Sequence, residues 1–334
     1  MLKKLITSLG LWYLYFPHMA LLRLMGPRCA IPFTRVTSFA HWLLTFVGAQ
    51  KRVRKTMEQV LPEIRPDLRI RSVLRKYLVI REQHFVQWYI SPSIRGGRFA
   101  QRACREIEGR EHLEAVLRNG RGVIVVFFHF GMARMNLAAL MSSGYDVCLH
   151  EIPFARYSGR TYDFVARAIM NREAGVKESS GRKAILHQSG STSKALADVL
   201  RRNEIVVLLG DGMAATRFVE VPFLNGMMSF STGLARLSAE TGAPIVCMFS
   251  LLEGLTRHRF VIHPPVYCRD NLPPSIEAAV MDYVAVFEDY VRRYPWAWWS
   301  WRRLDVKRGT DEKIRLILRD VPTQGTSTSP QKSA

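Results

Sequence analysis

The chain has 334 residues, 48% of them hydrophobic, so it can bury the core of one elaborate domain or of two ordinary ones. Its 48 Lys and Arg against 28 Asp and Glu give a net charge of +20, which suits an anionic membrane, a phosphorylated substrate or a nucleic acid. No helix-turn-helix, zinc-finger or RNP pattern occurs, which argues against nucleic acid, and five widely spaced cysteines without a CxxC pair predict reduced thiols and no metal site.

The first thirty residues predict a membrane-anchoring or interfacial helix. Residues 5–25 are mostly apolar, but Pro17, His18 and Arg23 interrupt them. Four aromatic residues lie between positions 12 and 16, as is typical of a membrane interface. The apolar stretch is just long enough to span a bilayer, so spanning and lying on the surface both stay open, with a buried core helix as the alternative.

Residues 31–104 predict a basic helical segment. Apolar residues recur every three or four positions in residues 73–85, with Arg and Lys between them. The run at 51–55 holds four basic residues. It is either a solvated helix face or a grip on anionic headgroups, which contributes roughly 1 kcal/mol per charge near a membrane surface.

From residue 105 to 305 strands alternate with helices. Strands are expected at 122–128, 145–151, 205–209, 244–251 and 259–263, and helices near 113–117, 132–142, 160–170, 192–202, 232–241 and 276–291. This alternation predicts an α/β domain with a mainly parallel central sheet flanked by helices. Residues 306–334 form a C-terminal extension that we expect to be disordered near its end.

His129 is the first candidate for chemistry. It follows a run of apolar residues at 123–128, which predicts a buried strand whose C-terminal end presents the imidazole to a cleft. Gly131 would let a ligand approach the backbone, and the helix that follows offers N–H groups to an oxyanion. The imidazole could take a proton from a hydroxyl and so start acyl transfer. A histidine packed into the core is the alternative.

Two further candidate sites lie at the end of a later predicted strand and at the start of a later predicted helix. Asp211 comes after the strand at 205–209, between two glycines, and is either a cleft carboxylate that orients a partner or part of an Asp-Gly turn. Ser231 or Thr232 is expected to cap the next helix, whose N-terminus would suit a carbonyl oxygen or a phosphate.

Four tryptophans between positions 296 and 301 run into Arg302 and Arg303. Core packing is one interpretation. Indoles beside guanidinium groups also suit a lipid–water boundary, where the two arginines would bind anionic headgroups.

Several short pieces occur together in one order. They are His-Phe-Gly at 129–131, Leu-Gly-Asp at 209–211, Val-Pro-Phe-Leu-Asn-Gly at 221–226, Thr-Gly-Leu-Ala-Arg-Leu at 232–237, Thr-Gly-Ala-Pro at 241–244 and Trp-Ser-Trp-Arg-Arg at 299–303. In this order they resemble the bacterial lipid A biosynthesis acyltransferases (the lauroyl/myristoyl transferase family) of the glycerophospholipid acyltransferase superfamily. The resemblance runs from about residue 105 to 305.

The resemblance implies a function. Members of that family move a fatty acyl group from acyl carrier protein, or from acyl-CoA, to a hydroxyl of a phosphorylated glycolipid in lipid A and lipopolysaccharide biosynthesis. They work at the cytoplasmic face of the cell inner membrane, without a metal or cofactor. The implied partners are therefore the donor, a lipid or glycolipid acceptor and anionic membrane lipids.

The family's catalytic histidine matches His129, but the position of its partner acid, five residues later, holds Arg134. Three outcomes stay open. Arg134 could face solvent or a substrate phosphate while Asp211 or Glu151 orients His129, His129 could work slowly alone, or the chain could be a catalytically degenerate homologue that binds lipid or acyl carrier. The prediction is an acyltransferase with His129 and Asp211 as catalytic residues. Its expected substrate-binding residues are Gly131, Arg134, Ser231, Thr232, Arg302 and Arg303.

Overall fold

The computed structural model describes residues 2–44, 49–90, 106–151, 162–169, 171, 183–186, 192–212, 215–253, 257–308 and 314–318. Its centre is a seven-stranded sheet with the order β1-β9-β8-β2-β5-β3-β4. The strands are β1 (Ile107–Glu108), β2 (Val123–Phe127), β3 (Val147–Glu151), β4 (Lys183–Leu186), β5 (Ile205–Leu209), β8 (Ile245–Glu253) and β9 (Arg257–Ile262).

The predicted mainly parallel sheet is confirmed. Strands β8, β2, β5, β3 and β4 run parallel, and β9 turns back antiparallel to β8 with β1 parallel to it. All five residues of β2 are buried, which explains their continuous apolar run, because helices cover both faces of a parallel sheet. The short strands β1 and β4 were not predicted.

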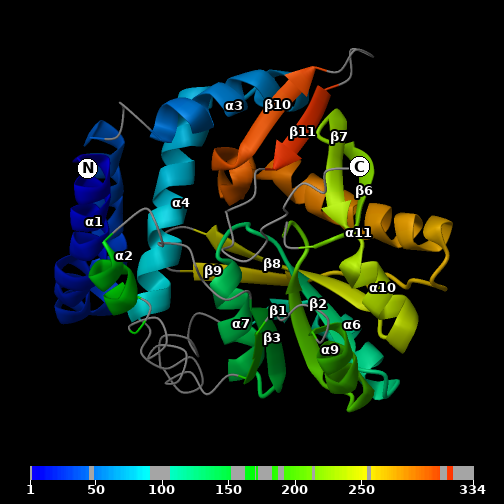
Figure 1. Ribbon diagram of the computed structural model, residues 1–334. Helices are drawn as coiled ribbons and strands as arrows, with labels where there is room; N and C mark the ends of the chain where they lie inside the picture. The colour runs from blue at the N-terminus through cyan, green and yellow to red at the C-terminus, as the bar shows by residue number, and fades with distance from the viewer. Residues whose placement is uncertain are drawn as a thin grey trace, which may run out of the picture.

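Alternate residues of β2 face two different cores. Ile124 and Val126 face the core shared with α9 (Thr192–Arg201), α10 (Gly233–Thr241) and α11 (Pro273–Arg293). Val123 and Val125 face the core shared with α6 (Arg110–Arg118) and α7 (Ala133–Ser142). The helices expected from the periodicity therefore form the two outer layers (Figure 1).

A second, four-stranded sheet was not predicted. It has the order β10-β11-β7-β6, with β6 (Phe218–Phe223), β7 (Gly226–Ser231), β10 (Leu304–Arg308) and β11 (Ile314–Leu318). The β6–β7 hairpin turns at Leu224 and Asn225, which both have positive φ. Because β11 pairs with β7, ordered structure continues beyond residue 305, and the expected disorder at the end of the chain falls on residues 319–334, outside those described.

The N-terminal residues form helices beside the central sheet (Figure 1). They are α1 (Leu2–Tyr13), a π-helical turn at Leu14–His18, α2 (Met19–Leu44), α3 (Ala49–Ile64) and α4 (Ile70–Ile90). A core containing Met19, Leu22 and Ile80 joins α2 and α4 to the α7 layer of the sheet. Among the described helices, none combines the length and the apolar character needed to cross a bilayer.

Candidate active site

The register of two neighbouring strands brings His129 and Asp211 together. Phe127, the last residue of β2, pairs with Leu209, the last residue of β5. Each candidate lies two residues beyond the end of its strand. Because the two strands are parallel, both side chains emerge at the same edge of the sheet, where open α/β sheets bind their ligands.

The two side chains form a hydrogen-bonded pair. His129 Nδ1 lies 2.9 Å from Asp211 Oδ1, and the backbone N–H of His129 donates to the same oxygen at 2.9 Å. A carboxylate only accepts hydrogen bonds, so Nδ1 carries the proton and the lone pair of the neutral ring is on Nε2. The His129 side chain is 27% exposed while that of Asp211 is fully buried, so the ring joins a buried anion to open space.

Asp211 is held on its other side by the tryptophan-rich segment. Trp298 Nε1 and Ser300 Oγ each lie 3.3 Å from Oδ2 and donate to it. Burial raises the pKa of Asp211, but the charge and hydrogen bonds of His129, together with the Trp298 bond, outweigh burial and hold the pKa below its ordinary value. The carboxylate is therefore ionised at neutral pH.

The same segment also pairs with the backbone around His129. Gly131 N donates to Ala297 O at 2.8 Å, and Trp299 N donates to His129 O at 2.7 Å. The Trp299 indole N–H donates to Gly131 O at 3.0 Å, and its ring meets the imidazole edge-on at 6.0 Å. We name residues 297–300 the strap, because they bind both members of the pair.

Close packing requires a glycine at position 131, which the sequence did not predict. Its φ is +52°, and a Cβ there would lie 2.0 Å from the carbonyl oxygen of Ser250 on β8. Its N–H and C=O are both bonded within the protein. The glycine thus lets the chain pass close to β8, rather than opening the backbone to a ligand as the sequence suggested.

The backbone N–H groups of His129 and of the three residues after it all donate hydrogen bonds within the protein. Those of residues 129–132 donate to Asp211, Phe128, Ala297 and Ser250 respectively. An oxyanion site formed by this backbone would therefore start only at α7 itself, beyond residue 132.

The remaining predicted site residues take different positions. Arg134 is the second residue of α7 and is half-buried. Ser231 Oγ accepts the Gly233 N–H at 3.2 Å, whereas the Thr232 hydroxyl donates to Arg217 O at 3.4 Å. Ser231 thus supplies the hydrogen bond at the start of α10.

Arg302 is exposed and Arg303 half-buried, directly after the strap. The side chain of Glu151, the other carboxylate considered for His129, lies outside the part that the structure describes. In the described residues, no group of three or more His, Cys, Asp or Glu could hold a metal ion.

Sequence reasoning missed Trp298 and Ser300 as partners of Asp211. The density of tryptophans was the available signal, but the indole N–H groups of Trp298 and Trp301 face buried acceptors rather than a lipid boundary. Trp298 and Trp301 are fully buried, and Trp301 Nε1 donates to Pro295 O at 2.6 Å. Core packing, the alternative interpretation, is correct for these two.

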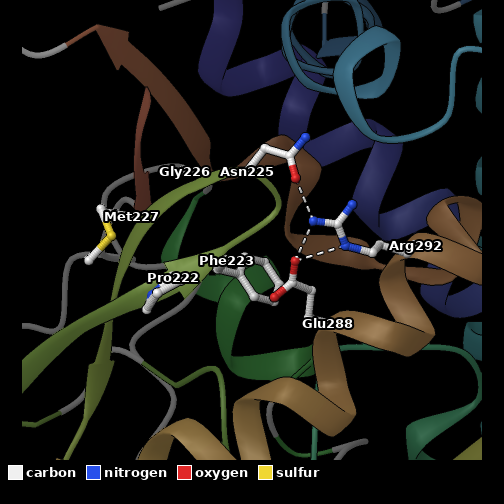
Figure 2. Close-up of a pocket in the computed structure, with 7 residues that line it drawn as sticks. All are labelled: Pro222, Phe223, Asn225, Gly226, Met227, Glu288 and Arg292. Carbon is white, nitrogen blue, oxygen red and sulfur yellow. Dashed lines mark hydrogen bonds and ion pairs between the residues drawn. The ribbon is translucent and has the colours of Figure 1, made fainter. Parts of the chain in front are cut away.

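A separate pocket of about 360 Å³ lies between the β6–β7 turn and α11 (Figure 2). Arg292 extends toward Asn225 and Glu288, donating to Asn225 Oδ1 at 2.7 Å and to Glu288 Oε1. None of the predicted site residues lines it. Its Phe223 also packs on Trp298, with ring centroids 5.6 Å apart, so this region supports the strap from behind.

Comparison with known proteins identifies the family of the chain. The chain matches the family model "Bacterial lipid A biosynthesis acyltransferase" over residues 2–304. It is 26% identical over 246 residues to a phosphatidylinositol mannoside acyltransferase of Mycobacterium tuberculosis strain H37Rv, and 25% identical to that of strain CDC 1551. Each alignment covers 71% of this chain and 72% of the relative. The chain therefore belongs to the bacterial lipid A biosynthesis acyltransferase family and is an acyltransferase.

Proposed function

We propose that His129 is the general base of an acyl transfer from a thioester to a lipid hydroxyl. Nε2 takes the proton of the acceptor hydroxyl while its oxygen attacks the thioester carbonyl. Asp211 stabilises the imidazolium, which then gives its proton to the departing thiolate, so that an ester and a thiol are formed. The observation that carries this proposal is the pairing of a partly exposed His129 with the buried, ionised Asp211.

Asp211 also explains how the chain can work with Arg134 in the position of the family's acid. Oδ1 of Asp211 already binds Nδ1, the nitrogen that an orienting carboxylate must bind. A second acid is then not needed for tautomer or orientation. This supports a working enzyme and weakens the case for a degenerate homologue, for which Arg134 was the motivation.

For the substrates, we propose acyl carrier protein or acyl-CoA as donor and an anionic glycolipid as acceptor. The net charge of +20 favours anionic partners, which all of these are. The mycobacterial relatives are named for acylating a mannosylated phospholipid, and the family for lipid A. Arg134, Arg302 and Arg303 are the guanidinium groups that we assign to substrate phosphates, because their fork geometry suits phosphate oxygens.

We further propose that the enzyme meets its acceptor at a membrane, the cytoplasmic face of the inner membrane, through α1. Leu5, Leu9 and Trp12 lie on one face of that helix and, with Phe164, are between 41 and 65% exposed. They border an apolar groove of about 390 Å³. Apolar side chains exposed together in this way are typical of a helix lying in the interface.

Membrane contact is tested by flotation with anionic liposomes at moderate salt, with retention on DNA as the comparison. We expect flotation, and its loss in a Leu9→Ser/Trp12→Ser double variant. Leu272→Ser is the matched control, because Leu272 is equally exposed, at 63%, but lies before α11. Equal flotation of all three proteins, or retention on DNA without flotation, would contradict this contact.

Activity is tested with purified protein, radiolabelled acyl-CoA or acyl carrier protein, and extracted lipids. We expect label in a glycolipid fraction, with the mass of one added acyl chain, and no transfer by the His129→Ala variant. Label only in simple phospholipids would overturn the glycolipid acceptor. Equal transfer by wild type and His129→Ala would overturn the assigned role of His129.

A further inference from the structure

We propose that Trp298 and Ser300 are positioning residues, which fix the Asp211 carboxylate so that His129 stays in the tautomer with its lone pair on Nε2. This inference rests on the proposed role of His129 as base. The side chains of Trp298 and Ser300 both donate a hydrogen bond to the same carboxylate oxygen of Asp211. Core packing alone would not require this, so the strap has a role beyond packing.

The four hydrogen bonds of Asp211 are divided evenly. Oδ1 accepts the backbone and ring N–H groups of His129, and Oδ2 accepts the indole N–H of Trp298 and the hydroxyl of Ser300. The side chain of Asp211 has no exposed surface, so bulk water cannot replace a missing donor. Without the strap, Oδ2 would be buried with no donor, and the carboxylate would turn to share its bonds differently.

The Trp298 indole cannot follow such a turn, because aromatic rings surround it. Its ring lies 5.0 Å from Trp301, 5.6 Å from Phe223 and 6.0 Å from Phe287, all in tilted or edge-on contact. Ser300 is also fixed, because its carbonyl accepts the Arg303 N–H at 2.7 Å and the residue is 1% exposed. Oδ2 is therefore fixed by two rigid donors rather than by mobile side chains.

The strap is also anchored from outside. Tyr77 of α4 donates its hydroxyl to the Trp299 carbonyl at 3.2 Å, and Lys76 lies 4.1 Å from the centre of the ring of Trp296, the residue just before the strap. The backbone of the strap meanwhile pairs with residues 129–131. Both sides of the His–Asp pair thus depend on one short segment held by α4.

The test compares three variants of the full chain. Trp298→Phe removes the indole N–H and keeps a buried ring, and Ser300→Ala removes one oxygen. Trp301→Phe is the matched control, because it also removes a buried indole N–H from the same region, but one that donates to Pro295 instead of Asp211. Nitrogen-15 NMR of labelled histidine reads the tautomer directly, with His129→Gln identifying the signal.

We expect the Nδ1–H form of His129 to dominate in wild type and Trp301→Phe, and to fall in Trp298→Phe and Ser300→Ala. Loss of one donor to a charged acceptor should lower kcat about tenfold or more while KM stays within about twofold. Ser300→Ala opens almost no cavity, so it carries the test even if Trp298→Phe folds poorly.

An unchanged tautomer in folded Ser300→Ala would overturn the positioning role, even if His129→Ala is inactive. A changed tautomer in Trp301→Phe as well would show a general packing effect and overturn it too. Conversely, an active His129→Ala variant would remove the proposed function while the tautomer measurement still reports on the strap. The two failures are therefore distinguishable.

Discussion

Asp211→Asn is the substitution that separates the charge of the buried partner from its shape. The amide fills the same space, and its oxygen can keep the bonds from Trp298 and Ser300 at the Oδ2 position, which places the NH2 group at the Oδ1 position facing His129. There the NH2 group can donate to the ring, which favours the tautomer with the proton on Nε2 and so removes the base. The variant should fold and fail in catalysis.

The size of the effect follows from the contacts of Asp211. A hydrogen bond to a charged group contributes about 1.5–3 kcal/mol, and losing the 2.9 Å bond to Nδ1 in the transition state would lower kcat by about 10- to 150-fold. The wrong tautomer adds to this, up to a total of about 10⁴-fold for an Asp→Asn change beside a catalytic imidazole. We expect kcat to fall by about 10²–10⁴-fold with KM nearly unchanged.

The assay is transfer of radiolabelled acyl groups from thioester to lipid at saturating donor. Asp198→Asn is the matched control, because Asp198 makes an exposed ion pair with Arg201 on α9, and its loss should change the rate by less than about twofold. A wild-type rate in folded Asp211→Asn, beside an inactive His129→Ala, would refute the reasoning, since His129 would then act without its carboxylate.

Three further predictions follow from the same contacts. Arg134→Glu should leave kcat at saturating substrates within about threefold of wild type, because Asp211 already orients the ring, but should raise the KM of the phosphorylated substrate that we assign to Arg134; activity gained only in this variant would instead indicate a degenerate enzyme. Gly131→Ala should lower the free energy of unfolding, measured in denaturant, by about 2–4 kcal/mol, because the new Cβ adds strain at positive φ and a clash with Ser250. Gly120 also has positive φ but no atom within 4 Å of a new Cβ, so Gly120→Ala should lower the same free energy by only about 1–2 kcal/mol. Equal losses in the two variants would contradict the clash. The pKa of Asp211 is lower in the folded than in the unfolded protein, so the ionised carboxylate stabilises the fold above the unfolded value near 3.8, and this stabilisation is lost as the pH falls through the folded-state pKa. Asp211→Asn should therefore make the free energy of unfolding depend less on pH on the acid side. An unchanged pH dependence would contradict the lowered pKa.

The central sheet could be predicted because its signals are local. The apolar runs that became β2 and β5 each end in a single polar residue, His129 and Asp211, at the edge where parallel strands present their chemistry. Periodicity could not predict the register between β2 and β5. This register places His129 and Asp211 within hydrogen-bonding distance of each other.

The contacts of the strap and of the second sheet could not be predicted, because they join segments that are distant in the sequence. Trp298 and Asp211 lie 87 residues apart, and nothing in the local pattern of an indole names its acceptor. The β6–β7 hairpin did carry a signal, since Leu224 and Asn225 followed by a glycine form a two-residue turn between alternating strands. The strands expected from the sequence did not include this hairpin, although its turn signal was present.

The most direct measurement is the single-turnover rate of acyl transfer to lipid by wild type and by folded His129→Ala. The imidazole with its free Nε2 should supply about 10²–10⁴-fold through proton transfer, so we expect the rate constant to fall by that factor while donor binding persists. An unchanged rate in His129→Ala would contradict the assignment of this histidine as the base.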